Sequence, residues 1–209
     1  MREKQKLYLI VGPTASGKTA ASLEVAKRIN AEVISADSIQ VYRGMDIGSA
    51  KPSMEERAGI PHHMLSVVAP NETKFSVACF REMADACIAD IAAREKRPLV
   101  VGGTGLYVNA LTYPLNFTGA PADPAIREKY VSLEAEQPGA AHKRLQEVDP
   151  ASAARLHPND KKRVIRALEV FELTGRPISE NGEGFSALDE SKLPYTVRIA
   201  GLTMPREVL

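Results

Sequence analysis

Residues 7–29 read LYLIVGPTASGKTAASLEVAKRI, an apolar run followed by a glycine-rich turn and then a stretch with helical spacing. The turn holds Gly12, four further residues, and then Gly17-Lys18-Thr19. When a strand, a loop and a helix follow one another in this way, the loop's backbone N–H groups converge on a phosphate, and the helix dipole strengthens its binding. The stretch therefore predicts a phosphate-binding loop, and with it an α/β fold in which a parallel sheet of the P-loop NTPase type is flanked by helices.

Each residue of this loop has an expected task. Lys18 supplies a positive charge to the outer phosphate, and the Thr19 hydroxyl ligates Mg²⁺. A chance Gly-Lys-Thr turn is disfavoured, because the strand precedes and the helix follows as the mechanism requires. The residues expected to contact the phosphates are Gly12, Pro13, Thr14, Ala15, Ser16, Gly17, Lys18 and Thr19.

The residues at the carboxyl ends of the other expected strands limit which reactions the phosphate loop could serve. An ATP-hydrolysing enzyme usually carries a second apolar strand that ends in a metal-holding acid, but PLVVGG at 98–103 ends in glycines. EVISAD at 32–37 does end in an acid, Asp37. The carboxyl ends of parallel strands share one cleft, so Asp37 and GGTGLY (102–107) should face the phosphate loop. Asp37 is then a metal ligand or a base, although taken alone it could equally be a turn residue or a helix cap.

The order of expected elements favours a core with a helical insertion. Apolar runs at 7–11, 32–35 and 98–101 predict strands, and helical spacing at 18–29 and 75–94 predicts helices. A Pro- and Gly-rich hinge starts near residue 115, and a helix capped by Asn159 or Asp160 and ended by Gly175 follows. YTVRIAGL at 195–202 predicts a strand that returns to the sheet. We expect a P-loop core over 1–114, a helical insertion over 115–190, and a return to the core over 191–209.

Composition places the chain among ordinary soluble proteins. It has 209 residues, 44% apolar and 25% charged, with a formal net charge of +1. No segment approaches the ~20 consecutive apolar residues of a membrane span, and the first apolar run continues into the phosphate loop, so we expect neither a cleaved signal nor a membrane partner. Cys79 and Cys87 lie roughly 12 Å apart along one expected helix and cannot pair with each other. We expect a cytoplasmic monomer.

Three smaller features have two interpretations each. His62 and His63 are adjacent, so in an extended stretch they point opposite ways and make a poor metal pair. Lys161, Lys162, Arg163 and Arg166 gather on about one and a half turns of helix, as a solvated face or as a grip on an RNA backbone. Arg127 near the hinge is either a surface charge or a phosphate contact.

Together these residues closely resemble the tRNA dimethylallyltransferases, also called tRNA isopentenyltransferases. The resemblance is carried by GPTASGKT (12–19), SADSIQVYRGMDIGSAKP (35–52), IPHHMLSV (60–67), GGTGLY (102–107) and HPNDKKRVIRALEVFELTG (157–175). The second and fourth of these together are nearly specific to the family. Ser49 stands where the family often has Thr, which keeps the hydroxyl.

The resemblance implies an activity and a set of site residues. In that family the loop holds the diphosphate of dimethylallyl diphosphate, and the dimethylallyl group passes to N6 of the adenine 3′ of the anticodon in tRNA. It implies Asp37 as the base, Thr104 and Lys18 as further catalytic residues, and Mg²⁺ on Thr19. The tRNA contacts that it implies are Asp37, Ser38, Ile39, Gln40, Thr104, Arg127, Lys161, Lys162, Arg163, Val164 and Ile165.

Two other classes remain open from the sequence. One is a P-loop transferase on a free small molecule, either an AMP or ADP isopentenyltransferase or a metabolite kinase. The other is a non-catalytic module that binds nucleotide or RNA. Members of the resembled family commonly continue well past the point where this chain ends, so we also expect the usual C-terminal part, which completes the core and helps hold tRNA, to be lacking.

Overall fold

The computed structural model describes residues 4–113, 122–180 and 193–204. Contacts divide the chain into two compact units, one made of residues 1–114 and 187–209 and the other of residues 115–186. Most of the expected Pro- and Gly-rich hinge that starts near residue 115 lies outside the described residues. No described helix is both long enough and apolar enough to cross a membrane.

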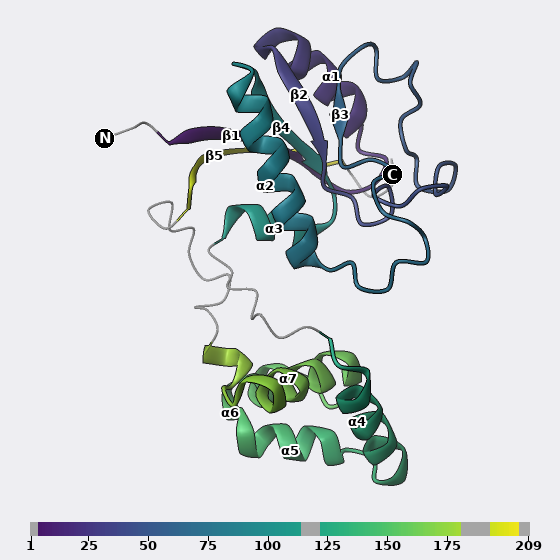
Figure 1. The fold of residues 1–209 in the computed structure, drawn as a ribbon, viewed down its shortest axis with the longest axis vertical. Helices are drawn as coiled ribbons and strands as arrows, with labels where there is room; N and C mark the ends of the chain where they lie inside the picture. The colour runs from purple at the N-terminus through teal and green to yellow at the C-terminus, as the bar shows by residue number, and fades with distance from the viewer. Residues whose placement is uncertain (1–3, 114–121, 181–192, 205–209) are drawn as a thin grey trace. The chain divides into compact units, whose positions relative to one another are not determined.

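The first unit, here the sheet unit, is built on five parallel strands in the order β3-β2-β4-β1-β5 (Figure 1). The expected strands at 7–11, 32–35, 98–101 and 195–202 and the expected helices at 18–29 and 75–94 are confirmed to within two residues at each end, while β3 and α3 were not predicted. The elements are β1 (Gln5–Val11), α1 (Lys18–Ile29), β2 (Ala31–Ser35), β3 (His62–His63), α2 (Val77–Ala93), β4 (Arg97–Gly102), α3 (Gly105–Thr112) and β5 (Tyr195–Gly201).

Alternation along β1 explains why helices cover both faces of this sheet. Leu7 and Leu9 are buried in the same cluster as residues of α2 and α3, including Phe80. Ile10 belongs to a second cluster with Ala26 of α1. Because successive strand residues point to opposite faces, α1 covers one face of the sheet and α2 with α3 covers the other.

The carboxyl ends of the three central strands are in register, and this aligns the loops that follow them. Val101 of β4 is paired with Ile10 of β1 and with Ser35 of β2. The next residue, Gly102, has no room for a side chain, because a Cβ there would lie 2.2 Å from the carbonyl oxygen of Ala36. The P-loop, the Asp37 turn and the GGTG turn therefore leave the sheet side by side.

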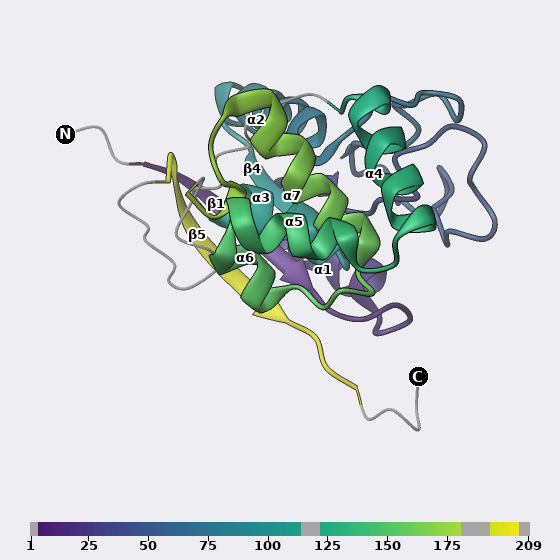
Figure 2. The same ribbon diagram turned by 90° about the horizontal axis from the view of Figure 1, so that it is seen from below.

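The second unit, here the helical unit, holds the helices of the expected insertion (Figure 2). Its core joins apolar residues of four helices, among them Tyr130, Leu145 and Leu168. Asp160 caps the last helix by accepting a hydrogen bond from the N–H of Arg163, and Gly175 ends it in a left-handed conformation, as predicted. The elements are α4 (Pro124–Glu136), α5 (Ala140–Val148), α6 (Pro150–Arg155), α7 (Lys161–Thr174) and the 3₁₀ turn η1 (Ile178–Glu180).

Candidate functional site

The loop between β1 and α1 presents unused backbone donors. Ala15 (φ 65°) and Gly17 (φ 81°) adopt left-handed conformations that fold the chain over the start of α1. The N–H of Ser16 donates to the carbonyl of Pro13 at 3.4 Å, whereas among the described residues the N–H groups of 14, 15 and 17–19 have no partner. Free N–H groups at a helix N-terminus are what a phosphate-binding loop requires.

Lys18 lies within this loop and close to Asp37. Its ammonium group donates to the carbonyl oxygen of Pro13 at 2.6 Å. Burial lowers the pKa of Lys18, and the negative charge of Asp37 acts in the opposite direction, so the two groups are within electrostatic reach. A Cβ on Gly103 would lie 3.9 Å from the Lys18 nitrogen, which places the end of β4 against the same group.

One oxygen of the Asp37 carboxylate accepts hydrogen bonds from the backbone, and the other has no hydrogen-bond partner among the described residues. Its Oδ1 accepts hydrogen bonds from the N–H of Ile39 at 2.8 Å and from the N–H of Gln40 at 3.1 Å. Two such bonds form a turn that fixes the orientation of the side chain. Within the described part of the chain no hydrogen bond reaches Oδ2, so this oxygen can accept a proton.

Thr104 joins the β4 end to the Asp37 turn. Its Oγ1 accepts a hydrogen bond from the N–H of Ser38 at 3.0 Å and donates to the Ser38 hydroxyl at 3.3 Å. Its own N–H donates to the carbonyl of Ala36 at 3.3 Å. The structure thus brings Lys18, Asp37, Ser38 and Thr104 together, as expected from the shared edge of the sheet.

Gln40, expected to contact RNA, uses its side chain on the protein. Its Oε1 accepts from the Ser35 hydroxyl at 3.0 Å, and its Nε2 donates to the carbonyls of Ser49 and Ala50 at 3.0 and 3.2 Å. The Gln40 amide therefore holds the 45–51 loop against the end of β2. The neighbouring Ile39 is 52% exposed and open to a ligand.

Lys51 holds the same loop, a role that the sequence analysis missed. Its side chain is 4% exposed and donates to the Tyr42 carbonyl at 2.7 Å, to Asp46 Oδ1 at 2.7 Å and to the Ser66 hydroxyl at 2.9 Å. All three ammonium protons are used. A lysine between small residues in GSAKP was the available signal, but the partners lie up to fifteen residues away and follow no pattern.

The residues fit a magnesium ion that a substrate helps to hold. No group of three His, Cys, Asp or Glu side chains in the described ranges could form a metal site. Thr19 is exposed and its hydroxyl has no partner among the described residues. Mg²⁺ is commonly held by one or two protein oxygens together with substrate phosphates, which matches this donor set.

The histidine pair has structural partners. The ring of His62 bonds through Nδ1 to the carbonyl of Ile60 at 2.8 Å, and His63 Nε2 lies 2.7 Å from the buried carboxylate of Glu32. The two rings have different partners, as expected for adjacent residues in an extended strand.

In the helical unit, some of the residues expected to contact tRNA are exposed and others are buried. Lys161 and Arg163 are exposed and pair with Glu134 (3.6 Å) and Asp160 (3.0 Å), respectively. Lys162 is exposed and has no partner in the part of the chain that the structure describes.

Val164 and Ile165 correct the expected list of tRNA contacts. They are 1% and 8% exposed and belong to the core of the helical unit, so their side chains are not available to RNA. They face inward because α7 is amphipathic and its apolar face packs on the other helices.

Arg127 forms an ion pair with Glu169. Its Nε donates to Glu169 Oε1 at 2.8 Å, and its Nη2 donates to Oε2 at 3.2 Å. Burial alone would raise the pKa of Glu169, but hydrogen bonds from Arg127 and Arg166 outweigh it and lower that pKa. Arg127 is still 49% exposed, so one edge of the guanidinium faces solvent.

Comparison with known proteins gives two family matches. The IPP transferase family matches residues 40–209, which is most of the chain. The isopentenyl transferase family matches residues 5–67, the stretch that contains the phosphate loop and the Asp37 turn.

Individual relatives agree over nearly the whole chain. A tRNA dimethylallyltransferase of Geobacter metallireducens is 51% identical over 207 residues, 99% of this chain and 66% of its own length. One from Pelotomaculum thermopropionicum is 48% identical over 99% of this chain and 64% of its own length. The chain therefore spans about two thirds of the length of these relatives.

Solved structures agree with the sequence matches. The tRNA isopentenylpyrophosphate transferase of Bacillus halodurans superposes with a TM-score of 0.62 at 46% identity, over 98% of this chain and 62% of that one. A eukaryotic dimethylallyltransferase captured acting on tRNA superposes with a TM-score of 0.79 at 33% identity, over 95% of this chain and 48% of that one. The chain belongs to the IPP transferase family.

Proposed function

We propose that this chain transfers the dimethylallyl group of dimethylallyl diphosphate to N6 of the adenine 3′ of the anticodon in tRNA, releasing diphosphate. The names of its relatives support the reaction and the substrate class. The observation that carries the proposal is the arrangement of Asp37, whose carboxylate is fixed through one oxygen, is free at the other, and lies within electrostatic reach of Lys18 in the phosphate loop.

The phosphate loop prepares the leaving group. The free N–H groups of residues 14, 15 and 17–19 bind the diphosphate, and Lys18 exchanges the Pro13 carbonyl for a phosphate oxygen. Thr19 would hold Mg²⁺, which when bound supplies further positive charge against the leaving diphosphate. The C–O bond of the allylic donor then breaks with its electron pair leaving on the diphosphate.

Asp37 prepares the nucleophile. The exocyclic amino group of adenine is weakly nucleophilic, so a base must take its proton as the new N–C bond forms. Asp37 Oδ2 takes that proton while the bonds from Ile39 and Gln40 keep Oδ1 in place. Thr104 acts through Ser38, because its hydroxyl fixes the backbone directly after Asp37.

RNA binding rests on exposed basic residues and on base flipping. A base stacked in an RNA loop cannot reach a side chain at the end of a strand, so the adenine must leave the stack. Exposed Lys161, Lys162 and Arg163 carry the positive charge that attracts the phosphate backbone, together with the exposed edge of Arg127.

The test is a mass measurement on RNA. The chain is incubated with Mg²⁺, dimethylallyl diphosphate and an anticodon stem-loop carrying adenine 3′ of the anticodon, with the Geobacter metallireducens relative beside it as a positive control. A dimethylallyl mass increment on that adenine, lost when it is replaced by guanine, is the expected result. No increment from a folded chain that binds the stem-loop, while the relative gives one, would contradict the proposal.

The match of residues 5–67 to the isopentenyl transferase family favours one second candidate, prenyl transfer to a free nucleotide. AMP and ADP are therefore added in separate reactions without RNA. Prenylated nucleotide in place of prenylated RNA would favour this candidate.

A further inference from the structure

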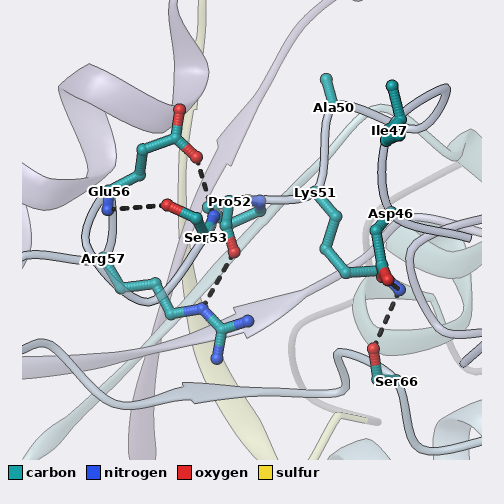
Figure 3. Close-up of a pocket in the computed structure, with 9 residues that line it drawn as sticks. All are labelled: Asp46, Ile47, Ala50, Lys51, Pro52, Ser53, Glu56, Arg57 and Ser66. Atoms are coloured by element: carbon teal, nitrogen blue, oxygen red, sulfur yellow. Dashed lines mark hydrogen bonds and ion pairs between the residues drawn. The ribbon is translucent and has the colours of Figure 1, made fainter. Parts of the chain in front are cut away.

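A hollow opens beside the site and plays no part in the reaction described above. Its volume is about 630 Å³, within the range of sites for small molecules. Figure 3 shows Glu56 and Arg57 on one side of it and Ile47, Asp46 and Lys51 on the other. Residues of the 45–57 segment therefore form most of its wall.

The free polar groups of the hollow both donate and accept hydrogen bonds. Lys51 is saturated by Tyr42, Asp46 and Ser66. Arg57 donates through Nε to the carbonyl of Pro52 at 3.1 Å, whereas its two Nη groups have no partner among the described residues. Glu56 accepts from the N–H of Ser53 through Oε2 only, so Oε1 is also free.

The balance of charge excludes a simple anion site. The wall carries two carboxylates, Asp46 and Glu56, and two cations, Lys51 and Arg57, so their formal charges cancel. A phosphate would meet as much repulsion as attraction. An uncharged ring with hydrogen-bond acceptors and donors on its edge is the better match.

An apolar side chain completes the wall. Ile47 lines the hollow and is 99% exposed. The loop that presents it is held by Lys51 and Gln40, and by bonds from the Ser49 hydroxyl to the Met45 carbonyl (2.6 Å) and from the N–H of Ala50 to the Ile47 carbonyl (3.2 Å). An isoleucine on so well braced a loop is positioned to contact the flat face of a ring.

We infer that this hollow is a second base-binding site, which takes an unpaired nucleobase of the RNA close to the adenine that reacts. The inference rests on the proposed function. Pro52 lines both this hollow and a smaller one whose wall includes Thr19 and Gln40, so the hollow adjoins the phosphate loop and the Asp37 turn. An RNA loop with one base at Asp37 carries its neighbours past the 45–57 segment. Arg57 binds the edge of such a base, and Ile47 contacts its face.

The test combines amino-acid substitutions in the hollow with abasic nucleotides in the RNA. Binding of the 209-residue chain to the anticodon stem-loop is measured by fluorescence anisotropy, with each loop nucleotide other than the target adenine replaced in turn by an abasic one. Arg57→Ala and Arg57→Gln are compared with Arg28→Ala, which removes the same charge from the exposed end of α1. Ile47→Ser is compared with Met54→Ser, an exposed side chain that does not line the hollow.

We expect the effect of the Arg57 substitution to depend on the base at a single loop nucleotide. Arg57→Ala weakens binding of the intact stem-loop by about tenfold, and Arg28→Ala by less than about twofold. At one abasic position the effect of Arg57→Ala falls to that of Arg28→Ala, because the base that Arg57 binds is already missing. Ile47→Ser shows the same dependence on that position, and Met54→Ser does not.

Three outcomes separate this inference from the proposed function. If Arg57→Ala weakens every abasic RNA as much as the intact one, Arg57 binds backbone phosphate or only supports the fold, and the inference is wrong although wild type makes product. If the coupling appears but no product forms, the site stands and the proposed reaction does not. If the wild-type chain does not bind the stem-loop at all, both are overturned.

Discussion

Strand β2 and the turn that follows it carry two carboxylates with opposite surroundings. Glu32 is 1% exposed and lies among two cations and a histidine: Arg94 pairs with both of its oxygens, Lys96 lies at 3.0 Å and His63 at 2.7 Å. Asp37, five residues later, forms no ion pair with any cation of the described residues and is held by two backbone N–H groups. One carboxylate is neutralised within the protein, whereas the other remains available to a ligand.

The difference shows where chemistry can occur on this sheet. A carboxylate already neutralised by its own cations resists protonation and cannot serve as a base. The two backbone donors orient the Asp37 carboxylate through Oδ1 and leave Oδ2 open to a substrate. The amino end of β2 therefore contributes stability, whereas the turn after its carboxyl end presents a carboxylate oxygen to a substrate.

The strongest test of this comparison is Asp37→Asn. The amide oxygen of asparagine can keep the hydrogen bonds from Ile39 and Gln40, so the turn should survive while the base is lost. We expect the turnover number for prenyl transfer to fall by about 10²–10⁴, with the free energy of unfolding and RNA affinity nearly unchanged. Activity within a few fold of wild type would show that Asp37 is not the base.

Glu32→Gln should have the complementary effect. It leaves Arg94 and Lys96 without the charge they surround, although both reach solvent, so we expect the free energy of unfolding to fall by about 3 kcal/mol. Denaturant titration measures this. Turnover at a temperature where the variant is folded should stay close to wild type, and a specific loss of turnover would break the comparison.

At acidic pH the difference in unfolding free energy between wild type and Glu32→Gln should become smaller. Hydrogen bonds from Arg94 hold the pKa of Glu32 well below its ordinary value of 4.5. A carboxyl whose pKa is lowered by folding stabilises the protein above its unfolded pKa, and this stability is lost as the pH falls toward the folded pKa. Unfolding free energies of both proteins, measured from neutral pH to below pH 4.5, should therefore converge. A constant difference over that range would show that Glu32 is not stabilised as a charge.

Gly102→Ala tests whether the carboxyl end of β4 must contact the backbone that follows β2. The new methyl group would meet the Ala36 carbonyl oxygen at 2.2 Å, so β4 and the Asp37 turn must separate. We expect a loss of about 1–3 kcal/mol in stability, and a larger relative loss in turnover because Thr104 moves away from Ser38. Gly48→Ala is the matched control, since open space surrounds that position. Equal effects of the two changes would contradict the role of this contact.

Lys162→Ala should have the smallest effect. One exposed lysine without a partner in the described chain contributes to RNA binding through phosphate charge alone. We expect binding to weaken a few fold, and the slope of log affinity against log salt to decrease by about 0.7–0.9. An unchanged slope would remove Lys162 from the RNA contacts.

Much of the fold of both units could be predicted because its signals are local. The phosphate loop, the apolar strands and the Asp160 and Gly175 caps lie in short stretches whose spacing determines their conformation. The meeting of Lys18, Asp37 and Thr104 followed from the rule that parallel strands end at a common edge. The short β3 was missed because two residues carry no periodicity.

Other parts of the site depend on contacts that no local pattern reveals. The side chain of Gln40 bonds the carbonyls of Ser49 and Ala50, and Lys51 bonds the Ser66 hydroxyl, so both hold a loop. Val164 and Ile165 were expected at the RNA because the family resemblance implied the whole 161–165 stretch, but helical geometry turns them inward. Family resemblance names a segment, and only the fold separates its exposed side chains from its buried ones.

The alignment of Ile10, Ser35 and Val101 limits how the chain can change in length. Each strand advances about 3.3 Å per residue and alternates its faces. Deleting one residue from β4 would move Thr104 away from Ser38 by that distance and turn its neighbours to the wrong side of the sheet. Insertions and deletions should therefore be tolerated among descendants of this gene in the exposed stretch 70–74, and be rare in the strands that end at the site.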